Sequence, residues 1–255
     1  MNVVLIQADL CWENPSANWK HFEQKIAEVD HADLIVLPEM FSTGFCTHPC
    51  EIAEPFEGPT LCWMQQVAHE KSVALCGSVA TKEEGRYYNR FYFVFPDGRY
   101  QYYDKRHLFT FGGEHKEYTA GQERVIVEYE GWRILLQVCY DLRFPVWSRN
   151  RGDYDMIIYV ASWPTPRVEA WSALLRARAI ENLCYVAGVN RVGDDPYCNY
   201  CGGTVLLDFL GKPMAEGVMG QEGILAGTLD QEALTAFRAK FPALQDGDFF
   251  TFEAE

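Results

Sequence analysis

A single α/β domain is predicted for this chain, because short apolar runs of strand length alternate with amphipathic helical segments and hairpin turns. No linker or low-complexity stretch interrupts the 255 residues, so the predicted domain spans residues 1–255. The composition, 48% hydrophobic and 15% aromatic, is sufficient for a large buried core.

The first half of the chain predicts strands alternating with two helices. Asn14 and Pro15 start the first helix, because an asparagine cap followed by proline favours a helix N-terminus. Gly58 and Pro59 start the second helix, which ends near residue 70, and residues 41–58 are expected to form a loop. The expected strands cover residues 3–8, 33–39, 73–80, 89–95 and 99–103.

The second half repeats this alternation. A helix is expected over Glu169–Leu183, with Trp171, Leu175 and Ile180 on its apolar side, and a last helix over Glu232–Lys240. The expected strands cover residues 125–129, 132–138, 155–162, 184–189 and 223–228, with a further hairpin over 204–214.

Three predicted strands lead into side chains that suit nucleophilic catalysis, namely Glu39, Lys105 and Cys139. The carboxyl ends of strands are where ligand sites collect, so these side chains can meet at one rim. A cysteine nucleophile needs a base or a neighbouring cation, and donors for the oxyanion. Glu39 is the predicted base and Lys105 the predicted cation, with the N–H of Tyr140 as a second donor. For an isolated cysteine, burial in the core would be the preferred interpretation.

Segments around these residues resemble the signature segments of the nitrilase superfamily of carbon–nitrogen hydrolases. They are Leu37–Phe41, Asp104–Phe109 and Val138–Pro145, and similarity extends to Trp171–Asn182 and Tyr185–Gly193. The resemblance implies an α-β-β-α sandwich and a catalytic triad of Glu39, Lys105 and Cys139. It also implies that no metal or organic cofactor is required, and that the chain forms a homodimer or a higher homo-oligomer.

Many members of the superfamily have a second glutamate near the lysine. Glu114, seven residues before Gly121, matches the usual spacing better than Glu117 does. Glu114 is therefore expected to belong to the catalytic site, and a solvated loop carboxylate is the alternative.

The segments around Lys105, Glu114 and Cys139 are similar to those of the omega-amidase branch. Its members convert 2-oxoglutaramate or 2-oxosuccinamate to the 2-oxo dicarboxylate and ammonia. Arginine suits the free carboxylate of such a small-molecule substrate. Arg143 is the expected contact, with Phe111 and Trp163 as pocket walls. The alternative is that Arg143 forms an ion pair with Asp141 or another carboxylate and thereby braces the loop.

Two other functions stay open: hydrolysis of nitriles, N-carbamoyl amino acids or other amides, and a non-catalytic binding role.

The net charge of −14 argues against nucleic acid and anionic membranes as partners. No apolar run approaches the roughly 20 residues that cross a bilayer. The N-terminal residues show no export signal, so we expect a cytoplasmic protein with nine reduced cysteines. Cys198 and Cys201 form half of a zinc or redox motif, and two reduced thiols in a loop are the preferred interpretation.

Overall fold

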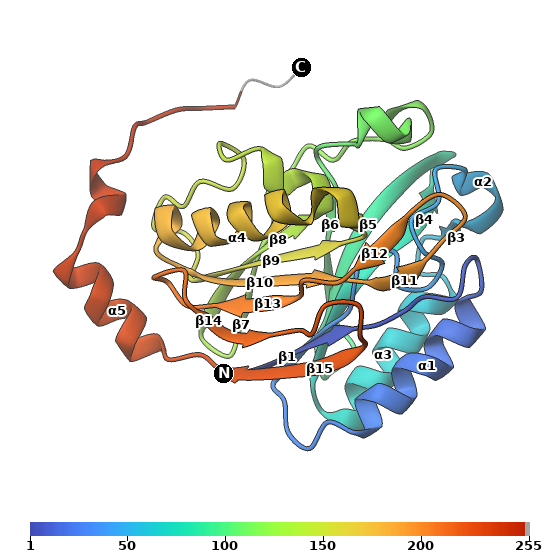
Figure 1. Ribbon diagram of the computed structural model, residues 1–255, viewed down its shortest axis with the longest axis horizontal. Coiled ribbons are helices and arrows are strands. Elements are labelled where there is room, and N and C mark those ends of the chain that lie inside the picture. Colours follow the sequence, from blue (N-terminus) through green and yellow to red (C-terminus); the bar gives the residue numbers. More distant parts are fainter. Residues whose placement is uncertain (253–255) are drawn as a thin grey trace.

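Two β-sheets lie face to face in the computed structural model, which describes residues 1–252 (Figure 1). The first sheet has the strand order β15-β1-β2-β4-β5-β6, with β3 paired to β4. Its strands are β1 (Asn2–Gln7), β2 (Leu34–Val36), β3 (Glu54–Pro55), β4 (Ala74–Glu83), β5 (Arg86–Val94), β6 (Tyr100–Asp104) and β15 (Gly223–Thr228).

The second sheet has the strand order β14-β13-β10-β9-β8-β7. Its strands are β7 (Ile126–Tyr129), β8 (Trp132–Val138), β9 (Met156–Ala161), β10 (Tyr185–Asn190), β13 (Val205–Leu207) and β14 (Pro213–Glu216). A separate hairpin pairs β11 (Val192–Asp194) with β12 (Asn199–Cys201).

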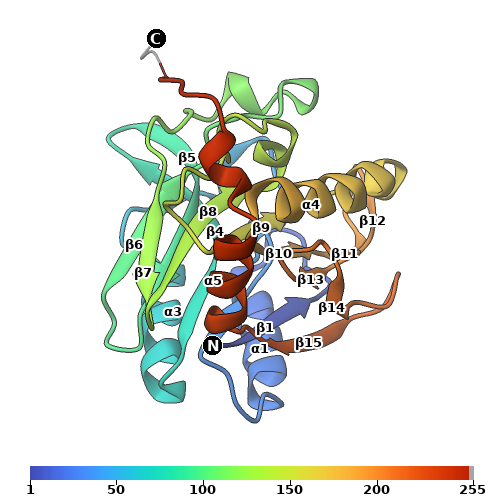
Figure 2. The ribbon, with the colours of Figure 1, turned by 90° about the vertical axis from the view of Figure 1, so that its left-hand side faces the viewer.

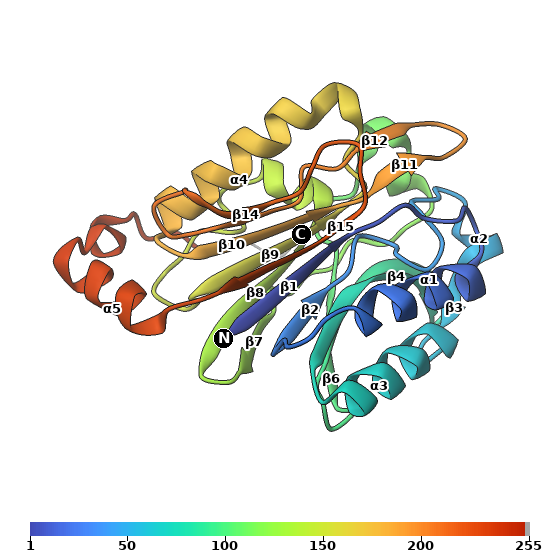
Figure 3. The ribbon, with the colours of Figure 1, turned by 60° about the horizontal axis from the view of Figure 1, so that its bottom comes forward.

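Helices cover the outer faces of both sheets, as Figure 3 shows. On the first sheet lie α1 (Pro15–Ala27) and α3 (Pro59–Lys71), and on the second lies α4 (Val168–Asn182). The short α2 (Pro49–Ile52) precedes β3, and α5 (Gln231–Lys240) follows β15 at one end of the sandwich (Figure 2). The order of layers is therefore α-β-β-α, as predicted.

The alternation of side chains along the strands produces three apolar layers. In β1, Val3 and Leu5 face the second sheet, whereas Val4 and Ile6 pack against α1 and α3. In the second sheet, Ile157 packs under α4. Because both faces of these strands are buried, their sequences are continuously apolar.

The structure differs from the sequence-based expectation at several points. Residues 41–58 contain α2 and β3 in addition to loop, and the hairpin β11–β12 was not predicted. The prediction that Ile180 lies on the apolar side of α4 is wrong, because Ile180 is 50% exposed. Arg178 and Asn182 are buried on α4 instead, where Arg178 donates to the carbonyl of Leu142 at 2.6 Å.

Within residues 1–252, no helix is long and apolar enough to cross a membrane. All nine cysteines are free thiols in the structure. The predicted domain limits of 1–255 include residues 253–255, which lie outside the described residues.

Candidate active site

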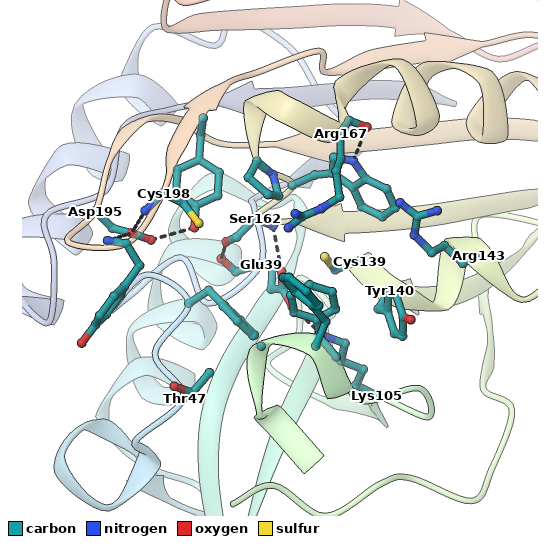
Figure 4. A pocket seen from close by; sticks show the side chains of 18 of the residues that line it. Glu39, Thr47, Lys105, Cys139, Tyr140, Arg143, Ser162, Arg167, Asp195 and Cys198 are labelled. Atoms are coloured by element: carbon teal, nitrogen blue, oxygen red, sulfur yellow. Dashed lines mark hydrogen bonds and ion pairs between the residues drawn. The ribbon is translucent and has the colours of Figure 1, made fainter. Parts of the chain in front are cut away.

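Three strands bring ionisable side chains to one rim of the sandwich (Figure 4). Glu39 lies in the turn after β2, Lys105 directly follows β6, and Cys139 directly follows β8. Glu114 joins them from the loop after β6. Strand β4 is parallel to β2, and β5 is antiparallel to both β4 and β6, so β2 and β6 end at the same edge of the sheet.

Lys105 lies between two carboxylates. Its Nζ is 3.1 Å from Oε1 of Glu39 and 2.9 Å from Oε2 of Glu114, and all three side chains are completely buried. Burial by itself lowers the pKa of Lys105, but the charges of Glu114 and then Glu39 outweigh it, so the net shift is upward. The lysine is therefore a cation at neutral pH.

Glu39 is held in place by three donors. Its Oε1 accepts hydrogen bonds from Lys105 and from Nδ2 of Asn89, the latter at 2.8 Å. Its Oε2 accepts from the main-chain N–H of Ser162 at 2.7 Å. The carboxylate is thus fixed in one orientation, which suits a proton acceptor.

Cys139 occupies a strained turn between β8 and a 3-10 helix over Cys139–Arg143. Its φ of 46° lies in the left-handed region, which residues other than glycine rarely adopt. The buried carboxylate of Asp141 braces this turn by accepting from the N–H of Val138 at 3.0 Å and the N–H of His107 at 2.9 Å. Such strain, held by surrounding contacts, is more typical of an active site than of a core cysteine.

The thiol of Cys139 is kept neutral. Burial raises its pKa well above the ordinary value of 9.0, Glu39 raises the pKa further, and Lys105 lowers it. A thiol in this state reacts once a base removes its proton, and Glu39 is the carboxylate with the largest effect on its pKa.

A pocket of about 400 Å³ opens beside Cys139 (Figure 4). The carboxylate of Asp195 on the pocket wall already has partners within the protein, because it accepts hydrogen bonds from the N–H groups of Tyr197 and Cys198, each at 2.7 Å. Aromatic side chains form part of the wall, namely Phe45, Phe109, Phe111, Tyr140, Trp163, Tyr197 and Tyr200.

Arg143 and Arg167 bring positive charge to this pocket. The guanidinium of Arg143 lies over the ring of Trp163 at 4.9 Å, and that of Arg167 lies over the ring of Phe109 at 5.3 Å. Neither guanidinium forms an ion pair with a carboxylate of residues 1–252. Both cations therefore remain available to an anionic ligand.

A comparison with protein families identifies the chain. The model of the carbon-nitrogen hydrolase family matches residues 2–239. The chain belongs to the carbon–nitrogen hydrolase family.

Curated relatives of this carbon–nitrogen hydrolase include two proteins named omega-amidase YafV. That of Yersinia enterocolitica is 48% identical and that of Escherichia coli K12 is 45% identical, each match covering 98% of both chains. The 2-oxoglutaramate amidase of Bacillus subtilis is 34% identical, with 94% of this chain and 95% of the relative covered.

Solved structures show the same fold. XC1258 of Xanthomonas campestris, a CN-hydrolase superfamily protein with an arsenic adduct in its active site, is 45% identical, with a TM-score of 0.96 and 99% of both chains covered. Nit3 of Saccharomyces cerevisiae, of the nitrilase superfamily, is 25% identical, with a TM-score of 0.85, and 95% of this chain and 94% of Nit3 are covered. The predicted nitrilase-like sandwich is therefore confirmed.

The structure of this carbon–nitrogen hydrolase brings Glu39, Lys105 and Glu114 into direct contact, with Cys139 beside them. Glu114 is completely buried and is not a solvated loop carboxylate.

The residues predicted to contact substrate all line the pocket. Tyr140, Arg143 and Trp163 lie along its wall, and Phe111, which is 86% exposed, is at its mouth. The alternative ion pair between Arg143 and Asp141 does not form among residues 1–252, since Asp141 is engaged by main-chain N–H groups and by the hydroxyl of Tyr103 at 2.8 Å.

Sequence reasoning missed three residues of the carbon–nitrogen hydrolase site, namely Asn89, Ser162 and Arg167. Ser162 contributes through its main chain, which a side-chain pattern does not reveal. Arg167 follows the Trp163–Pro166 segment and could have been proposed as a second cation. Asn89 lies near the start of β5, whereas the predicted catalytic residues follow the ends of strands. Within residues 1–252, no group of His, Cys, Asp and Glu side chains could hold a metal ion.

Proposed function

We propose that this carbon–nitrogen hydrolase is an omega-amidase that removes ammonia from the omega-amide of a 2-oxo dicarboxylic acid, such as 2-oxoglutaramate or 2-oxosuccinamate. The observation that carries the proposal is the presence of two guanidinium groups, free of ion pairs within residues 1–252, in the pocket that contains Cys139. Such a substrate has a carboxylate at one end and an amide at the other. Binding of the carboxylate by Arg143 and Arg167 therefore directs the amide toward the thiol.

The relatives support the same substrate class. Proteins named omega-amidase and 2-oxoglutaramate amidase match almost the whole length of the chain. Phe111 and Trp163 form part of the aromatic surroundings of the pocket, where the short carbon chain of the substrate is shielded from water.

In the first half of the proposed reaction, Glu39 takes the proton of Cys139 as the sulfur attacks the amide carbonyl carbon. The negative charge that develops on the carbonyl oxygen is stabilised by Lys105 and by the N–H of Tyr140. Collapse of the tetrahedral intermediate breaks the carbon–nitrogen bond. Glu39 returns the proton to the leaving nitrogen, so ammonia departs and a thioester remains on Cys139.

In the second half, Glu39 removes a proton from a water molecule that attacks the thioester carbonyl. The carbon–sulfur bond then breaks, the thiolate recovers a proton from Glu39, and the 2-oxo dicarboxylate leaves. Glu114 supports both halves, because it orients Lys105 and offsets part of its charge.

The test is ammonia release from 2-oxoglutaramate and 2-oxosuccinamate, measured beside a neutral amide, a simple nitrile and an N-carbamoyl amino acid. We expect the 2-oxo acid amides to have the highest kcat/KM, and the Cys139→Ala variant to be inactive with the fold intact. A clear preference for the nitrile or the N-carbamoyl compound would contradict the proposed substrate class. Equal turnover by Cys139→Ala would contradict the mechanism.

Two expectations remain predictions. They are the assembly of the chain as a homodimer or larger homo-oligomer, which light scattering can measure, and its cytoplasmic location.

A further inference from the structure

Asn89 lies behind the catalytic carboxylates and does not line the pocket. It is near the start of β5, and because β5 is antiparallel to β4 and β6, the start of β5 lies at the rim where its neighbours end. The side chain of Asn89 is completely buried. Its main-chain carbonyl accepts a hydrogen bond from the N–H of Lys105 at 3.0 Å, so residue 89 also fixes the backbone that carries the lysine.

The amide of Asn89 is oriented by the two carboxylates. Its Nδ2 lies 2.8 Å from Oε1 of Glu39 and 3.4 Å from Oε1 of Glu114. The opposite orientation would place Oδ1 against both carboxylates, where lone pairs and negative charge repel it. In the orientation that the structure has, Nδ2 donates to the site and Oδ1 faces away from it.

This orientation leaves Oδ1 of Asn89 buried without a hydrogen-bond partner among residues 1–252. A buried acceptor without a partner is destabilising, and native proteins contain few of them. An apolar side chain of similar size would avoid this cost. The amide at position 89 is therefore better explained by what Nδ2 does for the carboxylates than by the stability of the fold.

We propose that Asn89 is a positioning residue that donates a hydrogen bond to Glu39 and holds its carboxylate aligned to take the proton of Cys139. The inference rests on the proposed role of Glu39 as the base. A hydrogen bond from a neutral amide favours the carboxylate form of a glutamate over its protonated form. Because the amide is uncharged, it does this without placing a second cation beside Lys105. Because Asn89 lies outside the pocket, it acts through Glu39 and not through the substrate.

The first test compares Asn89→Leu with the wild type across pH. Without the amide donor, Glu39 is protonated more easily, so the acid limb of kcat/KM should move to higher pH. At neutral pH we expect kcat to fall about 10- to 100-fold, as for the loss of a hydrogen bond to a charged group, with little change in KM. Asn89→Ala should show the same changes to a smaller degree, because water can enter the space and donate. If Asn89→Leu does not fold, the pH profile of Asn89→Ala is compared with that of the wild type instead.

Asn182→Ala is the matched control. Asn182 is also completely buried, but its Oδ1 accepts from the main-chain N–H of Asn150 at 2.9 Å, and the residue does not line the pocket. This variant should lower the melting temperature and leave the acid limb in place. An acid limb in the Asn89 variants that coincides with that of the wild type would overturn the proposal, whatever their melting temperatures.

A second readout does not require the substrate. Alkylation of Cys139 by iodoacetamide, followed by peptide mass spectrometry with exposed Cys50 as internal reference, reports the transfer of the thiol proton. The pH dependence of this alkylation should move upward in Asn89→Leu relative to the wild type. If wild-type protein fails to hydrolyse the 2-oxo acid amides, the proposed substrate is wrong, and the alkylation profile still decides the role of Asn89. Identical profiles would overturn that role.

Discussion

The inner cluster of the site, made of Glu39, Lys105, Glu114 and Asn89, contrasts with the outer pocket that contains Arg143 and Arg167. In the inner cluster every charged group is completely buried and contacts a group of opposite charge. In the outer pocket, Arg143 is exposed and Arg167 is half-buried, and neither has a carboxylate partner in the described part of the chain.

This difference separates two tasks. Buried ion pairs add little net stability, but removing one partner leaves an uncompensated charge, so the inner cluster is held in one geometry. Exposed cations without partners cost little and can bind an incoming anion. We therefore expect changes in the inner cluster to affect kcat and folding, and changes in the outer pocket to affect substrate selection.

The largest effect is expected for Lys105→Met. This change leaves the carboxylates of Glu39 and Glu114 buried without their cation, so the free energy of unfolding should fall by about 3–5 kcal/mol. Because the oxyanion of the proposed mechanism also loses its charged donor, kcat should fall by about 10²- to 10³-fold or more. Urea unfolding and steady-state kinetics measure the two effects. Arg143→Met is the control, and an equal loss of stability in both variants would refute the separation of tasks.

Glu114→Gln should have a smaller effect on activity, with kcat lower by about 10- to 100-fold. The amide retains an acceptor for Lys105 but removes one of the two negative charges that face it. Burial raises the pKa of Glu114, although Lys105 opposes this shift.

A raised pKa in the folded state means that ionisation of Glu114 opposes folding. The contribution of protonated Glu114 to stability is therefore lost as the pH rises from 4.5, the pKa of Glu114 in the unfolded chain, through the higher pKa in the folded state. Unfolding measured across this window should show a smaller loss with rising pH in Glu114→Gln than in the wild type. A steeper loss in the variant would contradict the direction of the shift.

Arg143→Gln and Arg167→Gln test the outer pocket. Each should lower kcat/KM for the 2-oxo acid amide by about 10- to 100-fold, chiefly through KM, because a charge-assisted contact with the substrate carboxylate is lost. A neutral amide should be hydrolysed as well by the variants as by the wild type. Arg143→Lys is the sharper control, since an ammonium group cannot reproduce both the contact of the guanidinium with the Trp163 ring and a bidentate contact with a carboxylate. Equal losses on both substrates would contradict a carboxylate contact.

The two regions also differ in how far the sequence predicts them. Glu39, Lys105 and Cys139 follow apolar strands, so their convergence at one rim could be predicted. The role of Asn89 could not be predicted, because Asn89 lies near the start of a strand and its approach to Glu39 depends on β5 being antiparallel to its neighbours. The fold class follows from the alternation of strands and helices. The exposure of Ile180 could not be predicted from the sequence, since helical periodicity gives no information on the hydrogen bonds that bury Arg178 and Asn182.

The smallest effect is expected for Phe111→Ala, which tests where the outer pocket ends. Phe111 is 86% exposed, and its main aromatic neighbour is Phe109 at 5.8 Å, so its truncation removes little buried surface. We expect kcat/KM to change by less than about threefold, as for residues at the rim of a binding site. Trp163→Ala is the contrast, because the buried Trp163 supports Arg143 and donates to the carbonyl of Arg167 at 2.7 Å. A loss in Phe111→Ala as large as that in Trp163→Ala would mean that Phe111 closes over the bound substrate.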